Sequence, residues 1–105
     1  NIKAEILYVV DNSNDNTQKI ISKLKQKNKN VHCIFRPSKY GIGSAHKDGL
    51  RWCYKRKYTS VITMDGDGTH DPKYLKTMIK KLINFDLVIS NRFIKKKIIK
   101  RLANF

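Results

Sequence analysis

The residues with the most specific chemistry are two aspartates separated by one glycine, Asp65-Gly66-Asp67. Glycines on both sides of Asp67 let the backbone approach a ligand closely. Mg²⁺ and Mn²⁺ prefer carboxylate oxygens and complete their coordination with water and substrate phosphates. The segment therefore predicts a divalent metal ion held on a diphosphate. The alternative is an ordinary Asp/Gly turn before a helix, although Asp71 alone would suffice to cap that helix.

A second candidate is the basic loop of residues 36–45, Arg-Pro-Ser-Lys-Tyr-Gly-Ile-Gly-Ser-Ala. It passes through Gly41 and Gly43 into the expected start of a helix. Free N–H groups and the helix dipole favour an anion at such a start, and Arg36 and Lys39 add full positive charges. The loop is thus either an anion site or a plain strand-to-helix connection with a Gly-Ser cap.

A third candidate is the polar run Asp11-Asn12-Ser13, which follows an apolar segment. These side chains could bind a polar heterocycle or a ribose through hydrogen bonds, or they could simply cap the next helix.

Most acidic residues of the chain lie in two clusters: Asp11 and Asp15 form one, and Asp65, Asp67 and Asp71 form the other. A chain with only 8 acidic residues thus concentrates five of them at two points.

Length and charge limit the possible classes. The 105 residues suit one small domain spanning residues 1–105. The formal charge of +15 calls for an anionic partner: nucleic acid, an anionic membrane surface or a phosphate-bearing substrate. Because 18 of the 23 basic residues are lysines among many Asn and Ile, much of this charge is compositional bias.

The remaining composition argues for a cytoplasmic protein, with contact to the membrane surface left open. Cys33 and Cys53 form no C-x-x-C motif, so we expect buried free thiols in a reducing compartment. No apolar run reaches the roughly 18 residues of a membrane span. The chain starts at Asn1 rather than Met, which is compatible with a fragment of a longer protein.

The apolar patterns predict alternating strands and helices. The expected strands are Glu5–Val10, Val31–Phe35, Val61–Met64 and Phe85–Ser90. One helix has the stripe Thr17, Ile20, Ile21 and Leu24, and a second places Ala45, Leu50, Cys53 and Tyr54 inward. A third is capped by Asp71, starts at Pro72 and buries Leu75, Met78, Ile79, Leu82 and Ile83.

The tail from Ile94 to Phe105 reads as a basic amphipathic helix. Its apolar stripe is expected to pack on a sheet, and binding of anionic lipid is the alternative. The whole pattern indicates an α/β domain with a largely parallel sheet and flanking helices. Ligands of such sheets bind outside the carboxyl ends of the strands, which is where both acidic clusters are expected.

Four motifs in this order resemble the family 2 glycosyltransferases of GT-A (Rossmann-like) fold, in particular the dolichyl-phosphate mannosyltransferase-like branch. The matching stretches are YVVDNSNDNT (8–17), RPSKYGIGSA (36–45), VITMDGDGTHDPKYL (61–75) and DLVISNRF (86–93). The resemblance implies transfer, with inversion, of a sugar from a GDP- or UDP-linked donor. Because the sequence offers no convincing general base, an acceptor that is already ionised at neutral pH, such as a polyprenyl phosphate, would fit this chain.

The resemblance also implies roles for individual residues. Asp11 would contact the nucleotide base with Asn12 beside it, and the loop with Arg36, Lys39, Gly41 and Gly43 would line the nucleotide pocket. Asp65 and Asp67, with Thr69, would hold Mg²⁺ or Mn²⁺ on the diphosphate, which makes Asp67 part of the catalytic machinery. Arg92 would face phosphate and be the second catalytic residue, by helping to stabilise the departing diphosphate, unless it is an ordinary surface arginine.

The chain also departs from the family pattern. Val10 stands where a first acid is usual, Asn16 replaces a common glycine, and the family's opening strand has no counterpart before Asn1. The acceptor-side loop after Phe93 is short. A second copy or a partner chain could supply the strand, in which case the protein would be an oligomer.

Two other functions compete with the transferase interpretation. One is a non-catalytic module that binds nucleotide sugar, or binds an anion or membrane through residues 95–101; nucleic acid is the less favoured partner. The other is a haloacid-dehalogenase-like phosphatase, because Asp65-Gly-Asp-Gly-Thr69 fits its D-x-D-G-T signature. Those enzymes need later acidic motifs, and no acid follows Asp86.

Overall fold

A computed structural model of the chain describes residues 3–90. Its contacts divide the chain into two compact units, residues 1–63 and residues 64–105. The expectation of a single domain stays a prediction. Within the described residues, no helix is long and apolar enough to cross a membrane.

The first unit is built on a parallel pair of strands, β1 (Ile6–Asp11) and β2 (Val31–Arg36). Their register runs from Ile6 opposite Val31 to Asp11 opposite Arg36. Both strands were predicted from the sequence. The observed bounds differ from the predicted ones by one residue at three of the four strand ends. The added residues at the carboxyl ends, Asp11 and Arg36, are two of the candidate site residues.

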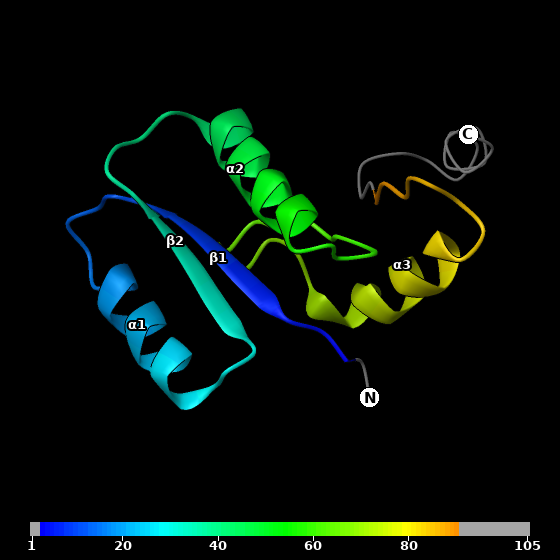
Figure 1. Cartoon of the computed structure of the whole chain (residues 1–105), viewed down its shortest axis with the longest axis horizontal. Helices are drawn as coiled ribbons and strands as arrows, with labels where there is room; N and C mark the ends of the chain where they lie inside the picture. The colour runs from blue at the N-terminus through cyan, green and yellow to red at the C-terminus, as the bar shows by residue number, and fades with distance from the viewer. Residues whose placement is uncertain (1–2, 91–105) are drawn as a thin grey trace. The chain divides into compact units, whose positions relative to one another are not determined.

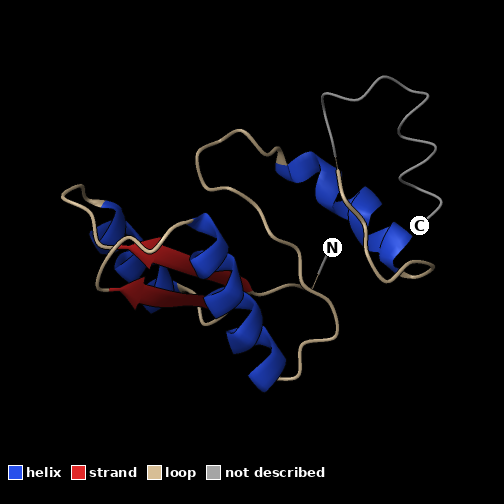
Figure 2. Ribbon diagram, turned by 90° about the horizontal axis from the view of Figure 1, so that it is seen from above, coloured by secondary structure: helices blue, strands red, loops and turns tan. Residues whose placement is uncertain are grey.

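Two helices cover the two faces of this sheet, α1 (Thr17–Lys27) on one side and α2 (Ile42–Lys55) on the other (Figures 1 and 2). The predicted α1 helix is confirmed, and Ile21 of its apolar stripe is buried on the side of the helix that faces the sheet. Ile20, however, is 57% exposed, so the apolar stripe is narrower than predicted. This β-α-β-α order gives the α/β class expected from the sequence.

Helix α2 forms where predicted, but its inward face is different. Leu50 and Tyr54 were expected inside and are 48% and 85% exposed. The inward face is set by Gly49, where an added Cβ would lie 3.3 Å from Val9 Cγ2 of β1. At 3.6 residues per turn, Leu50 and Tyr54 lie about 100° and 140° around the helix from Gly49, which turns both toward solvent.

An aromatic cluster holds the carboxyl end of α2 on the sheet. The Trp52 ring lies between His32 of β2, 5.0 Å away between ring centroids, and Tyr58, at 5.7 Å. The Tyr58 hydroxyl donates a hydrogen bond to Glu5, just before β1. The Arg56 guanidinium also lies 3.9 Å from the Trp52 centroid. This cluster was not predicted from the sequence, because its members are far apart in the chain.

Both cysteines, Cys33 in β2 and Cys53 in α2, are free and half-buried. Free thiols were predicted, and this part of the prediction is confirmed. Burial raises the pKa of the Cys53 thiol above its ordinary value, although the positive charge of Arg56 opposes the shift. The Cys53 side chain therefore acts as a small packing group.

Two predicted strands, Val61–Met64 and Phe85–Ser90, do not form in the described structure. Most of their apolar side chains stay exposed: Val61 and Met64 are 39% exposed, and Leu87 is 72% exposed. A β-rich segment becomes a strand only when a neighbouring backbone pairs with it. In the described part of the chain, these segments have no such pairing, and the sheet has two strands.

The second unit contains a 3₁₀ turn, η1 (Pro72–Tyr74), which leads into α3 (Leu75–Leu82). Asp71 caps this start as predicted, because its Oδ1 accepts a hydrogen bond from the Lys73 N–H at 2.9 Å. Four of the predicted apolar positions are half-buried: Leu75, Met78, Ile79 and Leu82. Ile83 was also expected inside but is 80% exposed, because the helix ends one residue earlier.

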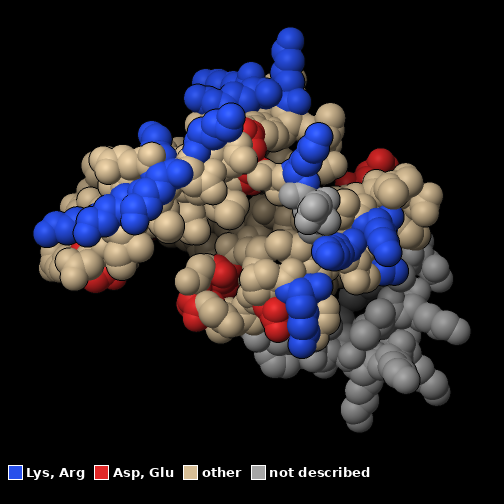
Figure 3. All heavy atoms as spheres, turned by 90° about the horizontal axis from the view of Figure 1, so that it is seen from below, with Lys and Arg blue, Asp and Glu red and all other residues tan. Residues whose placement is uncertain are grey.

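The predicted tail helix, residues 94–105, and Arg92 lie outside the described residues. On the face seen in Figure 3, Lys and Arg side chains spread widely, whereas Asp and Glu form small separate patches. This distribution agrees with the view that many lysines are ordinary solvated side chains.

The close approach at Gly49 gives a testable packing requirement. Gly49→Leu should lower the free energy of unfolding by roughly 1–3 kcal/mol, because the larger side chain would push α2 from Val9. Urea denaturation measures this. Gly43→Leu, in the same helix, is the matched control, because a Cβ there meets nothing within 4 Å. Equal losses in both variants would contradict the packing argument.

Candidate functional site

The candidate site of the first unit starts from a cross-strand ion pair at the carboxyl edge of the sheet. Asp11 ends β1 and Arg36 ends β2, and the two residues are register partners. Arg36 Nε lies 2.7 Å from Asp11 Oδ1. Both atoms are buried and their angle is not that of a hydrogen bond, so the contact is a close ion pair. Because partners in register share one face of a sheet, the pair is fixed by the strands themselves.

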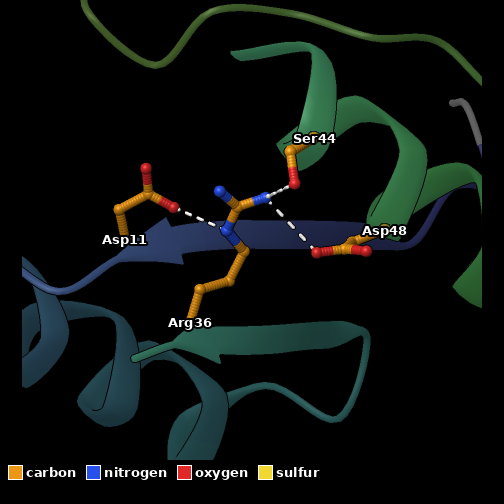
Figure 4. A network of polar contacts seen from close by, with 4 residues as sticks. All are labelled: Asp11, Arg36, Ser44 and Asp48. Atoms are coloured by element: carbon orange, nitrogen blue, oxygen red, sulfur yellow. Dashed lines mark hydrogen bonds and ion pairs between the residues drawn. The ribbon is translucent and has the colours of Figure 1, made fainter. Parts of the chain in front are cut away.

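The same arginine reaches across to the first turns of α2 (Figure 4). Arg36 Nη1 donates hydrogen bonds to Ser44 Oγ at 3.1 Å and to Asp48 Oδ2 at 3.3 Å. The Arg36 side chain is only 3% exposed, and its guanidinium lies between Asp11 on one side and Ser44 and Asp48 on the other. One guanidinium therefore joins β1, β2 and α2.

Sequence reasoning missed Ser44 and Asp48 as members of this cluster. A signal was present, because residues four apart share one face of a helix. A serine and an aspartate at that spacing, just after a strand ending in arginine, are suited to hold its guanidinium. Tyr40 adds a further contact, since its ring centroid lies 5.4 Å from Arg36 Cζ.

The loop after β1 is ordered by Asp15. Its Oδ1 accepts hydrogen bonds from Ser13 Oγ at 2.7 Å and from the Thr17 N–H at 3.0 Å, at the start of α1. These hydrogen bonds, Ser13 first, lower the pKa of Asp15 from 3.8 to about 2, and the charge of Lys39 adds a small part. Asp15 rather than Asp11 therefore binds the N–H of the first residue of α1, while the N-cap residue itself is Asn16. Asn12 lies exposed in this loop.

The loop after β2 enters α2 through Gly41, which is the N-cap residue. Its φ of 87° lies in the left-handed region that favours glycine. No side chain caps this helix start, so the N–H groups of the first turn can meet a ligand. Lys39, Gly41 and Gly43 are exposed there. The geometry suits an anion, and anion binding itself stays a prediction.

In the second unit, the D-x-D segment forms a tight turn. Asp67 Oδ1 accepts hydrogen bonds from the Thr69 N–H at 2.9 Å and from Thr69 Oγ1 at 2.5 Å. These bonds, the hydroxyl first, lower the pKa of Asp67 below its ordinary value, so it is a carboxylate at neutral pH. Gly68, at a φ of 82°, allows the turn.

Asp65 contacts a residue that sequence reasoning did not select. Its backbone N–H donates a hydrogen bond to His70 Nδ1 at 2.8 Å, and its Oδ2 lies 3.8 Å from His70 Nε2. The Asp65 side chain is 41% exposed. The D-G-T-H spacing lets the histidine fold back over the turn, but nothing in the sequence alone distinguishes it from a surface histidine.

The donor atoms of this turn suit a hard divalent cation in part. Asp65 and Asp67 offer carboxylate oxygens, and Asp67 Oδ2 is not used by Thr69. In residues 3–90, no group of three or more His, Cys, Asp or Glu side chains is arranged to hold a metal ion. Two carboxylates match Mg²⁺ or Mn²⁺ only when water and ligand phosphates supply the remaining oxygens.

The candidate residues thus fall into two groups. Asp11 and Arg36 are in contact in the first unit. In the same unit, Lys39 is near enough to Asp15 to lower its pKa. Asp65, Asp67 and Thr69 are gathered in the second unit. The expectation that both groups of residues lie at the carboxyl ends of the strands of one sheet stays a prediction.

A parallel α/β layer with polar groups at the carboxyl edge of its strands is typical of ligand-binding domains of the α/β class. The family model of glycosyl transferase family 2 matches residues 2–102. The chain therefore belongs to glycosyl transferase family 2, and the D-x-D-G-T segment is part of that match rather than of a phosphatase.

Curated relatives agree with this assignment. An undecaprenyl-phosphate mannosyltransferase of Micrococcus luteus is 33% identical over 86% of this chain and 37% of its own length. A polyprenol monophosphomannose synthase of Mycolicibacterium smegmatis is 33% identical over 88% of this chain and 36% of its own length. The chain thus spans little more than a third of these relatives.

A third relative is an uncharacterized protein of Methanocaldococcus jannaschii, 33% identical over 87% of this chain and 42% of its own length. No solved structure matches the chain significantly.

The hydrogen bonds of Asp15 predict an acid-sensitive loop. Because folding lowers the pKa of Asp15, the unfolded chain binds this proton more tightly, and stability is lost as pH falls from 3.8 to about 2. Above that range the contribution is fully present. Asp15→Asn should make the stability curve shallower in this window, as measured by urea unfolding at each pH.

The matched control is Asp86→Asn, which removes the same charge from an exposed position. This control should keep the dependence on pH seen in the parent chain. If the dependence of stability on pH were the same in Asp15→Asn as in the parent chain, the hydrogen bonds from Ser13 and Thr17 would not favour the ionised carboxylate over the protonated one.

Proposed function

We propose that the protein is a glycosyltransferase that moves a sugar from a nucleotide diphosphate donor to a polyprenyl phosphate. The observation that carries the proposal is the carboxyl edge of the sheet, where an arginine-held Asp11 lies beside the uncapped start of α2. Family membership and the names of two relatives, which specify undecaprenyl phosphate and polyprenol phosphomannose, support the same interpretation.

The first unit would bind the nucleotide of a GDP- or UDP-linked sugar. Asp11 is 29% exposed although its Oδ1 is buried, so the rest of its carboxylate can accept N–H groups from a base. Asn12 would add a polar contact. Lys39 and the N–H groups after Gly41 would bind the negatively charged phosphates.

The second unit would stabilise the departing diphosphate. Asp65 and Asp67, with the Thr69 hydroxyl beside them, would hold Mg²⁺ or Mn²⁺, which would offset the charge that develops on the leaving group. The two hydrogen bonds from Thr69 further stabilise the ionised form of Asp67 and so lower its pKa. Arg92, beyond the described residues, is proposed to face the same phosphates.

The acceptor proposal follows from proton chemistry. A hydroxyl acceptor needs a general base, and the sequence offers no convincing one. An acceptor phosphate, with a second pKa near 6, is already largely ionised at neutral pH. It can attack the sugar carbon directly, and one displacement inverts that carbon. We propose that the protein acts at the cytoplasmic membrane surface, where the excess of lysine would favour anionic lipid.

Donor binding predicts a thermal shift that depends on the D-x-D residues. GDP- or UDP-sugar with Mn²⁺ should raise the melting temperature of the parent chain by several degrees, because a ligand that binds only the native state stabilises it. Asp65→Ala and Asp67→Ala should lose the Mn²⁺-dependent part. Asp86→Ala is the control, and it should shift as the parent does.

A parent chain that shows no shift with any of these sugars, with or without Mn²⁺, would count against nucleotide-sugar binding. A shift that persists in both alanine variants would retain the nucleotide proposal and exclude the metal role of Asp65 and Asp67.

The acceptor proposal predicts the class of product. With radiolabelled nucleotide sugar, label should pass to a polyprenyl phosphate and not to the corresponding free polyprenol. The transfer should decrease at least a hundredfold in Asp67→Ala, in line with the loss of electrostatic stabilisation of a leaving group. Transfer to a hydroxyl acceptor, with none to lipid phosphate, would overturn this proposal.

A further inference from the structure

We propose that Arg36 is a positioning residue: it fixes Asp11 for contact with the nucleotide base and does not itself bind the diphosphate. The inference rests on the proposed nucleotide binding of the first unit. It differs from the expectation that the basic loop supplies two phosphate ligands, Arg36 and Lys39. The reason lies in the burial and charge of the cluster that Arg36 forms.

The two members of the ion pair differ in how far they are exposed to solvent. The Arg36 side chain is 3% exposed, and its Nε and Nη2 atoms are both buried. A phosphate oxygen would have to displace neighbouring residues to reach them. Asp11 is 29% exposed, so an incoming ligand meets the carboxylate before it meets the guanidinium.

Charge leads to the same conclusion. The single positive charge of Arg36 lies beside two carboxylates, 2.7 Å from Asp11 Oδ1 and 3.3 Å from Asp48 Oδ2. The three groups together carry a net negative charge, which repels a diphosphate. Lys39, which is exposed, has no such pair of carboxylates among the described ion pairs and suits the phosphate.

A fixed carboxylate is the right group for a base. Guanine and uracil both have a ring N–H, and a carboxylate that cannot rotate accepts it at little entropic cost. Asp11 is held through Nε, while Nη1 of the same guanidinium is anchored on Ser44 and Asp48. Arg36 therefore holds Asp11 in a fixed position relative to α2. Asp48 contributes to this positioning because it anchors the guanidinium.

Calorimetric titration with three probes tests this role: GDP, UDP and inorganic pyrophosphate, each with Mg²⁺. Arg36→Lys keeps the charge but loses the planar fork that joins Asp11 to α2. We expect it to weaken binding of the preferred nucleotide about tenfold or more, since tenfold corresponds to the low end of the value of one hydrogen bond to a charged group. Binding of pyrophosphate should be unchanged, because pyrophosphate has no base.

Asp11→Asn should also lose nucleotide affinity, while its affinity for pyrophosphate should not fall, because the variant removes a repelling charge. The double variant should bind nucleotide no more weakly than either single one, because both act through one contact. Arg51→Lys is the matched control in an exposed position of α2 and should bind all probes normally. If Arg36→Lys does not fold, as judged by circular dichroism, Asp48→Asn replaces it, with the same selective loss expected.

The outcomes separate the two proposals. A parent chain that binds none of the probes would overturn the proposed function, and this inference with it. A parent that binds, combined with an Arg36→Lys variant that loses pyrophosphate as much as nucleotide, would overturn the inference alone, since Arg36 would then be a phosphate ligand. Unchanged nucleotide affinity in Arg36→Lys and Asp48→Asn would overturn it as well.

Discussion

The buried guanidinium of Arg36 is the constraint on which the first unit depends. An arginine removed from water is tolerated only when carboxylates and other acceptors surround it, and breaking such a pair leaves an uncompensated charge. Here the partners come from the end of β1 and from the first turns of α2. The contacts of this one guanidinium thus join three elements, and their common edge is where the nucleotide is proposed to bind.

Local signals predicted much of this fold. Asp71 before Pro72 identified a helix start because the aspartate needs only the next backbone N–H groups. The two strands and α1 were likewise marked by runs of β-branched residues and by an apolar stripe of helical period. Asp11, Arg36 and the D-x-D turn were selected because their chemistry is visible in the residues themselves. Their assignment to a known family came from the order of four motifs and not from any one.

What the sequence could not supply depends on contacts between distant residues. Val61–Met64 has the composition of a strand, but pairing requires a neighbouring backbone that local propensity does not specify. The inward face of α2 followed from a close contact between Gly49 and Val9, which no periodicity count contains. The role of Asp48 similarly required Arg36 to be in place across a helix-sheet interface. Long-range geometry, not residue type, separated the confirmed predictions from the wrong ones.

The charge of the chain also acquires a different meaning from these contacts. Its formal +15 is carried largely by lysines, which attract anions over a distance with little selectivity. The few aspartates are instead held in defined orientations: Asp11 by Arg36, Asp15 by Ser13 and Thr17, and Asp67 by Thr69. A side chain held in one orientation can discriminate between ligands, because a misplaced donor finds no partner. In this protein the abundant charge would therefore gather phosphate-bearing ligands, and the scarce carboxylates would decide which of them fit.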